Sequence, residues 1–165
     1  MRSLFLFLCL VFPFLAQSAN AGEMPDPAPL FAATLTDLDG KAVAMKDLRG
    51  KPLLVNFWAR WCGPCRVEIP ELTKVQRQMK DKGLVVVGIG LEDKSETVRE
   101  FARAYEMEYT VLLAKDQGLP LLRALGNMKA ALPYTLAIDR NGKVVSTKLG
   151  LMTKADIDAA LARLY

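Results

Sequence analysis

Two cysteines, Cys62 and Cys65, lie three positions apart in the segment Trp61-Cys62-Gly63-Pro64-Cys65. A disulfide between them closes almost no loop and contributes little loop entropy, so its purpose is to be made and broken rather than to staple the fold. The spacing predicts thiol-disulfide exchange with other proteins. A single Cys-x-x-Cys is also typical of half a metal site or of a small structural disulfide, and these readings stay open on spacing alone.

The position of Cys62 favours the redox interpretation. It follows an apolar run at 53–58 and stands where a helical pattern begins, among unpaired backbone N–H groups and a positive helix dipole that stabilise a thiolate. Pro64 suits an early helical position, and Gly63 allows a partner chain to approach closely. We therefore predict that Cys62 attacks a substrate disulfide and that Cys65, one turn on, resolves the mixed disulfide.

The chain contains no histidine. This excludes Cys-His nucleophilic catalysis and His-bearing metal sites, and no second Cys-x-x-Cys completes a metal centre. Proton transfer at the thiols must then involve carboxylates, water or backbone groups. We expect no cofactor and no metal.

Residues 1–21 have the pattern of a secretory signal peptide, with Arg2, an apolar run at 4–16 and small residues at 19–21 before Gly22. The apolar run is shorter than the roughly 20 residues that span a bilayer, so cleavage before Gly22 is expected, with a retained anchor as the alternative. Cys9 leaves with this segment. The protein is expected in the periplasm, without stable membrane insertion.

The distribution of charged residues gives little support for a nucleic-acid partner. The chain has 22 Lys and Arg against 18 Asp and Glu, a net charge of +4, and the basic residues are scattered among acids. No block of the kind that binds nucleic acid is present, so nucleic acid is not expected as a partner.

The organisation is that of one domain at 30–165 after a linker at 22–29, whose three prolines predict extended rather than helical chain. Hairpins are expected at 31–36 with 41–44 and, around Asn141-Gly142, at 134–138 with 143–147. Buried strands are expected at 53–58 and 84–89, and a short strand at 109–113. Helices are expected at 63–82, 95–107 and 119–125 and from Thr153, which Asp156 completes as a capping box.

The helix at 63–82 is predicted to bury Val67, Leu72, Val75 and Met79 on one face and to bend at Pro70. The next helix is expected to be capped by Asp93 or Ser95, and the last one to bury Ile157, Leu161 and Leu164. Strands that alternate with helices predict parallel pairing in the centre, and the final hairpin adds antiparallel strands. The fold class is therefore α/β, a mixed sheet with helices on both faces.

Two segments carry a family resemblance: 56–70, read as NFWARWCGPCRVEIP, and 131–143, read as ALPYTLAIDRNGK. They closely resemble exported, periplasmic thioredoxin-fold thiol-disulfide oxidoreductases of the TlpA/ResA group, and the resemblance covers the chain from about Leu30 to its end. It implies a thioredoxin fold with an N-terminal β-hairpin and a central helix-strand insertion between about Ser95 and Leu113.

The resemblance also assigns site residues. Pro133 is expected as a cis proline that faces the cysteines, with the Leu132 backbone pairing with an extended substrate segment. Asn56 stands where cytoplasmic thioredoxins carry a buried Asp, and Glu92 is expected to approach the cysteines and take part in proton transfer. Glu68 also recurs in the motif; a salt bridge with Arg or Lys on its helix is the expected role, and a part in catalysis is the alternative.

Trp61, beside Cys62, is expected to be an exposed platform for partner docking, whereas Trp58, Phe57 and Val55 are expected in the core. The favoured function is reduction of disulfides in exported proteins, apocytochrome c among them, with electrons from a membrane thiol-disulfide donor. A net oxidase or isomerase is the alternative enzyme. A copper chaperone or disulfide-bearing adaptor is the alternative outside catalysis.

Overall fold

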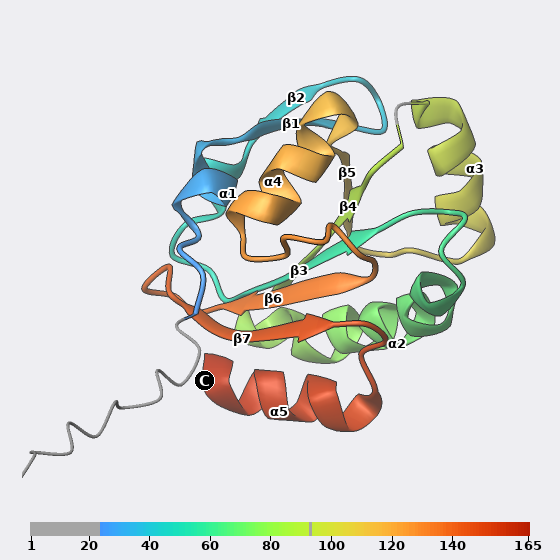
Figure 1. Cartoon of the computed structure of the whole chain (residues 1–165). Coiled ribbons are helices and arrows are strands. Elements are labelled where there is room, and N and C mark those ends of the chain that lie inside the picture. Colours follow the sequence, from blue (N-terminus) through green and yellow to red (C-terminus); the bar gives the residue numbers. More distant parts are fainter. Residues whose placement is uncertain (1–23, 93) are drawn as a thin grey trace, which may run out of the picture.

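The computed structural model describes residues 24–92 and 94–165. The signal-peptide prediction for residues 1–21 and the proposed cap at Asp93 lie outside these residues. Within them the chain forms a seven-stranded mixed sheet with strands in the order β2-β1-β5-β4-β3-β6-β7, and helices cover both of its faces (Figure 1). The mixed α/β architecture predicted from the sequence is confirmed.

The centre of the sheet is parallel. β3 (Leu53–Trp58) pairs in parallel with β4 (Val85–Gly90), and β4 pairs in parallel with β5 (Thr110–Leu113). All six residues of β3 are buried, as expected for a strand covered on both faces. This explains why its sequence is a continuous apolar run with Asn56 as the exception.

Antiparallel hairpins complete both edges. β1 (Thr34–Asp37) pairs with β2 (Ala42–Ala44) and joins β5. On the other side β6 (Tyr134–Ile138) pairs with β3, and β7 (Val144–Leu149) pairs with β6. The turn between β6 and β7 contains Asn141 and Gly142, with Gly142 at a φ of 77°, as the Asn-Gly signal predicts.

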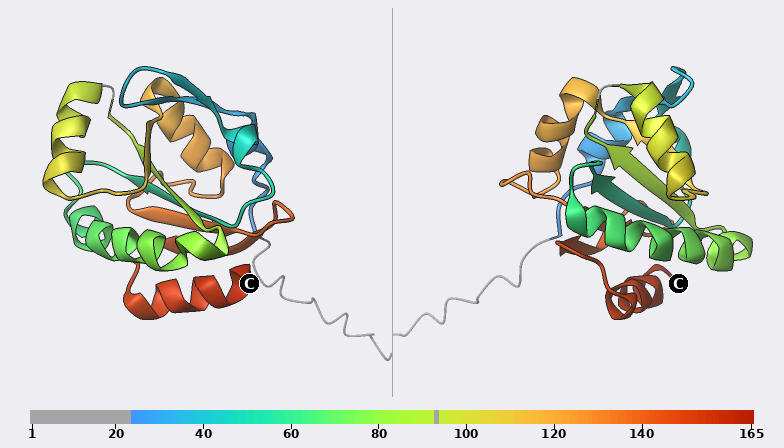
Figure 2. Two further views of the ribbon diagram at one scale, coloured as in Figure 1. Left: turned by 180° about the vertical axis from the view of Figure 1, so that it is seen from behind. Right: turned by 90° about the vertical axis from the view of Figure 1, so that its right-hand side faces the viewer.

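Two helices cover one face of the sheet. α1 (Ala28–Ala32) and α4 (Gly118–Ala124) pack on the side of Leu53, Val55 and Phe57. Figure 2 shows these two helices on the side of the sheet away from α2. The expected positions of Val55 and Phe57 in the core are confirmed.

The opposite face carries the longest helix. α2 (Gly63–Met79) and α5 (Lys154–Leu164) pack on the side of Leu54, while α3 (Ser95–Ala104) packs against Trp58. The predicted capping box of Thr153 and Asp156 at the start of α5 is present. Asn56 points to this second face, because it lies between Leu54 and Trp58 in a strand whose side chains alternate.

Four local predictions were wrong. Residues 28–32 form α1 rather than extended linker and strand, because Pro29 occupies the first helical turn, where its missing N–H costs nothing, and Leu30 and Phe31 bury against the sheet. Val67 is 63% exposed, because the buried face of α2 is formed by Cys65, Glu68 and Ile69 and Val67 lies on the opposite side of the helix. Ser95 is the first residue of α3 and not its cap, and the helix ends at Ala104 rather than 107.

Candidate active site

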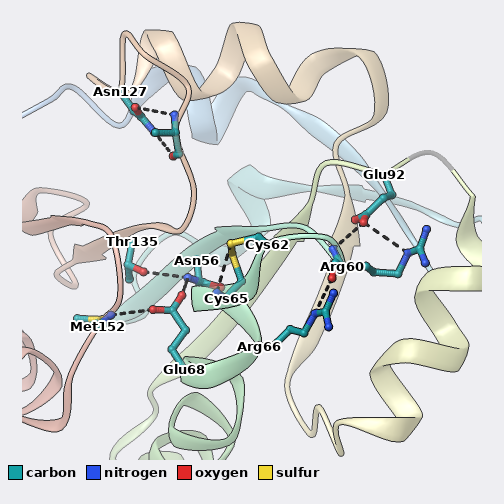
Figure 3. Close-up of a disulfide and its surroundings, with 11 residues drawn as sticks. Asn56, Arg60, Cys62, Cys65, Arg66, Glu68, Glu92, Asn127, Thr135 and Met152 are labelled. Atoms are coloured by element: carbon teal, nitrogen blue, oxygen red, sulfur yellow. Dashed lines mark hydrogen bonds and ion pairs between the residues drawn. A yellow bond between two sulfur atoms is a disulfide. The ribbon is translucent and has the colours of Figure 1, made fainter.

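The two cysteines lie where β3 leads into α2, and they form a disulfide with an S–S distance of 2.04 Å (Figure 3). Cys62 is the N-cap of α2, and its Sγ accepts a hydrogen bond from the Cys65 backbone N–H at 3.2 Å. This is the helix-terminal position predicted for a stabilised thiolate. Cys62 keeps 5% of its surface exposed and Cys65 none, so Cys62 is the sulfur that a partner reaches first.

The surroundings of Cys62 on the outer side are open. Trp61 is 71% exposed and Trp58 is fully buried, as expected for these two side chains. A Cβ added to Gly63 would meet no atom within 4 Å, and Pro64 is exposed as well. Beside Trp61 the surface has a hollow of about 530 Å³, whose lining residues are Trp61, Leu91, Lys115, Asp116 and Leu119.

Pro133 follows a cis peptide bond from Leu132, the isomer that the family resemblance implied. Leu132 packs against the cluster that contains both cysteines, so the structure brings the proline loop and the redox pair together. Leu132 remains partly exposed. The two motifs, separated by about 70 residues in the sequence, thus form one site.

Glu92 is held by the loop that leads into Cys62. Its Oε1 accepts the Arg60 backbone N–H at 2.6 Å and lies 3.4 Å from the Arg60 Nε. Arg66 Nε in turn donates to the Arg60 carbonyl at 2.8 Å. Glu92 therefore acts on the conformation of residues just before Cys62, on the side of the disulfide away from Glu68 (Figure 3).

Glu68 is the carboxylate buried beneath the cysteines, and the surface salt bridge expected for it was wrong. Only 1% of its surface is exposed, and its Oε1 accepts from Asn56 Nδ2 at 2.6 Å. Asn56 Nδ2 also donates to Thr135 Oγ1 at 2.9 Å. Cys65 and Glu68 are three residues apart on α2 and so share one helix face.

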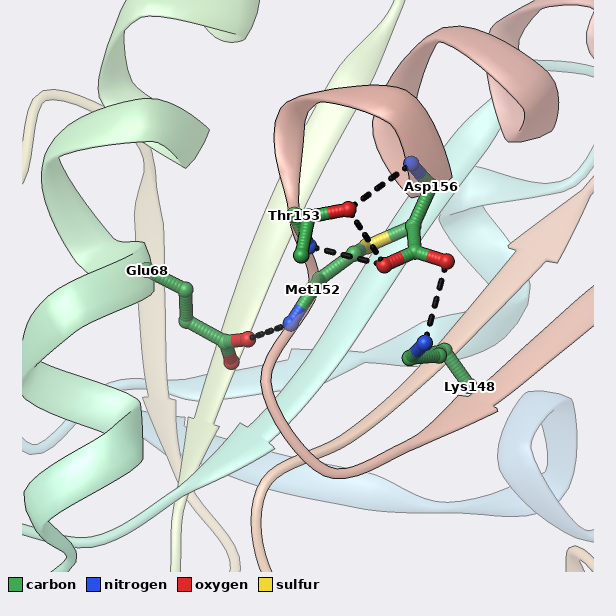
Figure 4. A network of polar contacts seen from close by, with 5 residues as sticks. All are labelled: Glu68, Lys148, Met152, Thr153 and Asp156. Atoms are coloured by element: carbon green, nitrogen blue, oxygen red, sulfur yellow. Dashed lines mark hydrogen bonds and ion pairs between the residues drawn. The ribbon is translucent and has the colours of Figure 1, made fainter.

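A second donor to Glu68 comes from the far end of the chain. The Met152 N–H donates to Glu68 Oε2 at 2.8 Å. Met152 stands just before α5, whose start is fixed by the reciprocal bonds of Thr153 and Asp156, with Lys148 donating to Asp156 at 3.0 Å (Figure 4). The charged form of Glu68 is thus stabilised by two donors but kept from water.

Burial raises the pKa of Glu68 to about 7, against the lowering effects of the Met152 N–H and the Asn56 amide. A carboxyl group with this pKa exchanges a proton near neutral pH. Burial, reinforced by the charge of Glu68, also raises the pKa of Tyr109. In the absence of histidine, Glu68 is the side chain at this site that is suited to exchange protons near pH 7.

The described residues contain no group of three or more Cys, Asp or Glu arranged to hold a metal ion. They also contain no helix that is both long and apolar enough to cross a membrane. The chemistry that the geometry supports is exchange between a helix-capping Cys62, a buried Cys65 and an external disulfide, and this defines the class as thiol-disulfide oxidoreductase.

Comparison with known proteins gives the same class. The Redoxin family model matches residues 23–161. The chain is 31% identical over 137 residues to the thiol-disulfide oxidoreductase ResA of Bacillus cereus, covering 83% of this chain and 76% of that protein. It is 35% identical over 136 residues to the thioredoxin-like protein YneN of Bacillus subtilis, covering 81% and 76%.

Solved structures agree on the fold. A putative thiol:disulfide interchange protein DsbE from Chlorobium tepidum superposes with a TM-score of 0.69 and 32% identity, covering 81% of this chain and 93% of that one. DsbF of Mycobacterium tuberculosis has a TM-score of 0.72 at 24% identity, covering 83% and 98%, and supports the fold alone. The chain belongs to the Redoxin family and, within it, to the ResA-like thioredoxin-fold thiol-disulfide oxidoreductases.

Proposed function

We propose that this oxidoreductase works as a reductase of disulfides in exported proteins, with Cys62 as the attacking and Cys65 as the resolving cysteine. The observation that carries the roles of the two cysteines is the unequal access of their sulfurs at the start of α2. Cys62 caps the helix beside the exposed Trp61, while Cys65 is fully buried above Glu68. A buried resolving thiol reacts with Cys62 and is shielded from other partners.

The reaction begins with the dithiol form. The Cys62 thiolate attacks one sulfur of the substrate disulfide, the substrate S–S bond breaks, and the departing substrate thiolate takes a proton from water. A mixed disulfide then joins Cys62 to the substrate. The Cys65 thiolate attacks Cys62 Sγ, the mixed disulfide breaks, and the second substrate sulfur leaves as a thiolate that also takes a proton from water. The substrate gains two electrons and two protons, and the enzyme ends as the Cys62–Cys65 disulfide.

Glu68 is the proton acceptor for the second step. The Cys65 thiol must lose its proton before it attacks, and Glu68, three residues on along the same helix face, has a pKa of about 7. The bonds from Asn56 and Met152 hold the carboxylate in place. When an external dithiol reduces the enzyme again, the same carboxyl group returns the proton to Cys65.

Substrate contact falls on residues around Cys62. Trp61 and the hollow lined by Leu91 and Leu119 accept apolar side chains of the substrate. Gly63 and Pro64 leave the sulfur accessible, and the backbone of Leu132, before the cis Pro133, pairs with the substrate chain. Apocytochrome c, whose haem-binding cysteines must be reduced, is a substrate of the right kind.

Export follows from the sequence features at the N-terminus. Residues 1–21 are the proposed signal peptide, the linker ends where α1 begins at Ala28, and the thioredoxin-like domain lies in the periplasm. Electrons are then supplied by a membrane thiol-disulfide donor. Mass spectrometry of the protein recovered from the periplasm of a bacterial host tests this: a mature chain that begins at Gly22 is expected, and a full-length chain in the membrane fraction contradicts it.

The direction of the reaction is tested by the reduction potential of the Cys62–Cys65 pair against dithiothreitol. We expect a value closer to the roughly −270 mV of thioredoxin than to the roughly −120 mV of DsbA. A value at the DsbA end would make the protein an oxidase. In parallel, Cys65→Ser is expected to trap substrates on Cys62, and Cys62→Ser to trap none.

A further inference from the structure

The loop between α4 and β6 has a fixed start. After α4, the Gly126 N–H donates to the Arg123 carbonyl at 3.1 Å and the Asn127 N–H to the Leu122 carbonyl at 3.0 Å, with Gly126 at a φ of 89°. These are the two bonds of a Schellman motif, which ends a helix with a left-handed residue. The backbone of Asn127 is therefore set by the helix and not by the loop that follows.

The loop is also held across the cis proline. Tyr134, the first residue of β6, donates from its hydroxyl to the Leu125 carbonyl at 2.8 Å in a buried bond. The residue after Pro133 is thus tied to the last turn of α4. Residues 127–133 form a short arch with both ends anchored, and Leu132 within it packs against the cluster that contains the two cysteines.

The side chain of Asn127 crosses the inside of this arch. It is 4% exposed, its Nδ2 donates to the Ala131 carbonyl at 2.7 Å, and its Oδ1 accepts the Ala131 N–H at 3.2 Å (Figure 3). A carboxamide carries both a donor and an acceptor, so asparagine satisfies both backbone groups of one residue. Both backbone groups of Ala131 are therefore hydrogen-bonded, as they would be to a neighbouring strand, but here the partner is the Asn127 side chain.

The pairing of Ala131 with Asn127 determines the direction in which the backbone N–H and C=O groups of Leu132 point. The residue before a proline favours extended backbone, and along extended chain successive residues direct their N–H and C=O groups to opposite sides. Ala131 is bound on the inner side by Asn127, so the groups of Leu132 are directed outward. Within residues 24–92 and 94–165, neither the N–H nor the C=O of Leu132 forms a hydrogen bond.

We propose that Asn127 is a positioning residue that holds Ala131 from inside and so offers the Leu132 backbone to an extended, cystine-bearing segment of the substrate. The inference rests on the proposed function and narrows its substrate class. A partner that pairs through its own backbone must be an unfolded or flexible chain, because the corresponding groups in a folded segment are already bonded. Side-chain sequence matters less, so many different unfolded chains are accepted.

The test compares Asn127→Ala with wild type on two disulfides. One is a cystine-containing peptide without secondary structure, and the other is 5,5′-dithiobis(2-nitrobenzoate), which has no peptide backbone. For the peptide, KM is expected to rise about tenfold, the effect of one hydrogen bond of typical strength, with kcat unchanged. The rate with the small disulfide and the Cys62–Cys65 reduction potential are expected to stay at the wild-type values.

Two further variants keep the test sharp. Asn127→Asp retains the acceptor for the Ala131 N–H and lacks the donor, so its KM is expected between those of wild type and Asn127→Ala. Asn141→Ala removes an exposed asparagine in the turn between β6 and β7 and is expected to match wild type. A rise in KM that affects both disulfides equally, a changed reduction potential, or an unchanged KM for the peptide overturns the proposal.

Binding without chemistry separates this inference from the function on which it rests. In a Cys62→Ser/Cys65→Ser background, the peptide is expected to bind about tenfold more weakly when Asn127→Ala is added. If wild type fails to reduce the peptide while this difference in affinity persists, the proposed reductase function fails and the role of Asn127 stands. If Asn127→Ala leaves the affinity unchanged, or the peptide does not bind at all, the role of Asn127 is wrong.

Discussion

The Asn56 amide donates to the Glu68 carboxylate across 2.6 Å in a bond that is fully enclosed by β3, β6 and α2. A neutral amide in this place supports a carboxylate without sharing its titration. Glu68 is therefore the single acid of the buried network, and its protonation is the event that the surrounding groups control.

Replacement of Glu68 by Gln is expected to change the pH dependence of stability. The unfolded pKa is 4.5 and the folded pKa about 7, so the folded state holds the extra proton and the Glu68 contribution is favourable below pH 4.5. It declines as pH rises to 7 and stays low above. Relative to Glu68→Gln, wild type is expected to lose about 3 kcal/mol of unfolding free energy between pH 4.5 and pH 8.

Urea unfolding of the oxidised protein measures this difference, because disulfide-bonded cysteines do not titrate. Parallel pH profiles for wild type and Glu68→Gln would show that Glu68 has an ordinary pKa. Glu71, a partly exposed carboxylate on the same helix that pairs with Lys74, is the control: Glu71→Gln is expected to keep the difference in stability between pH 4.5 and pH 8 that wild type shows.

Asn56→Asp is expected to destabilise the protein in a pH-dependent way. It places a second carboxyl group at hydrogen-bond distance from Glu68, and two carboxylates at such a distance cannot both ionise without a strong rise in one pKa. The loss of stability is expected to be several-fold greater at pH 8 than at pH 5, measured by thermal unfolding. Asn141→Asp, at an exposed turn, supplies the comparison, and an equal loss at both pH values for Asn56→Asp would contradict the assignment.

The two tryptophans are expected to separate activity from stability. Trp61→Ala removes an exposed ring and is expected to change unfolding free energy by less than about 0.5 kcal/mol while raising KM for protein disulfides. Trp58→Ala removes a buried ring that stacks on Phe101 at 5.2 Å between centroids and is expected to cost about 3–5 kcal/mol. Insulin reduction and urea unfolding, measured on both variants, give activity and stability. If Trp61→Ala is destabilised, Trp61 supports the fold and is not a docking residue.

Glu92 is expected to act by position rather than by proton transfer. Glu92→Gln keeps an oxygen acceptor for the Arg60 N–H and is expected to retain most of the wild-type rate. Glu92→Ala releases residues 59–61 and is expected to slow attack by Cys62, measured by iodoacetamide alkylation of the reduced protein. If Glu92→Gln is as slow as Glu92→Ala, the carboxylic acid itself takes part in the chemistry.

Thr153→Ala is expected to lower unfolding free energy by about 1 kcal/mol, the usual effect of losing an N-cap side chain. It also removes the hydroxyl whose hydrogen bond is the largest cause of the low pKa of Asp156, about 2. The pKa of Asp156, followed by NMR titration of its carboxyl carbon, is therefore expected to rise in the variant. An unchanged value would assign the shift to the Thr153 backbone N–H and Lys148, the other groups that lower this pKa.

Sequence patterns predicted the strands, helices and turns whose conformation is set by residues close to one another in the sequence. The apolar run at 53–58 has no polar face, so it had to be a strand covered on both sides, and Asn141-Gly142 specified the final hairpin. α1 was missed because Pro25, Pro27 and Pro29 together indicate extended chain. Its helix is stabilised by Leu30 and Phe31 packing on a sheet formed by later residues.

In the candidate active site, too, the sequence predicted the residues that stand in local motifs and not those that depend on distant contacts. Cys62, Cys65 and Pro133 stand in motifs and lie where expected. Glu68 looked like any acid on a charged helix, and only Asn56 and Met152, 12 and 84 residues away, reveal it as buried. A signal was present in its spacing of three from Cys65, which places both on one helix face. The role of Asn127 could not be predicted from the sequence, because its side chain binds backbone groups, which are the same in every residue.

Met152 donates its N–H to Glu68 from the segment just before α5. The C-terminal helix is therefore more than a cover for the sheet. A change anywhere in α5 that shifts its first turn also withdraws a donor from the carboxylate, and the acid strength of the redox site changes with it. A fusion or truncation at the C-terminus is therefore expected to change proton transfer at the cysteines. Kinetic constants measured on such proteins depend on the altered terminus as well as on the cysteines.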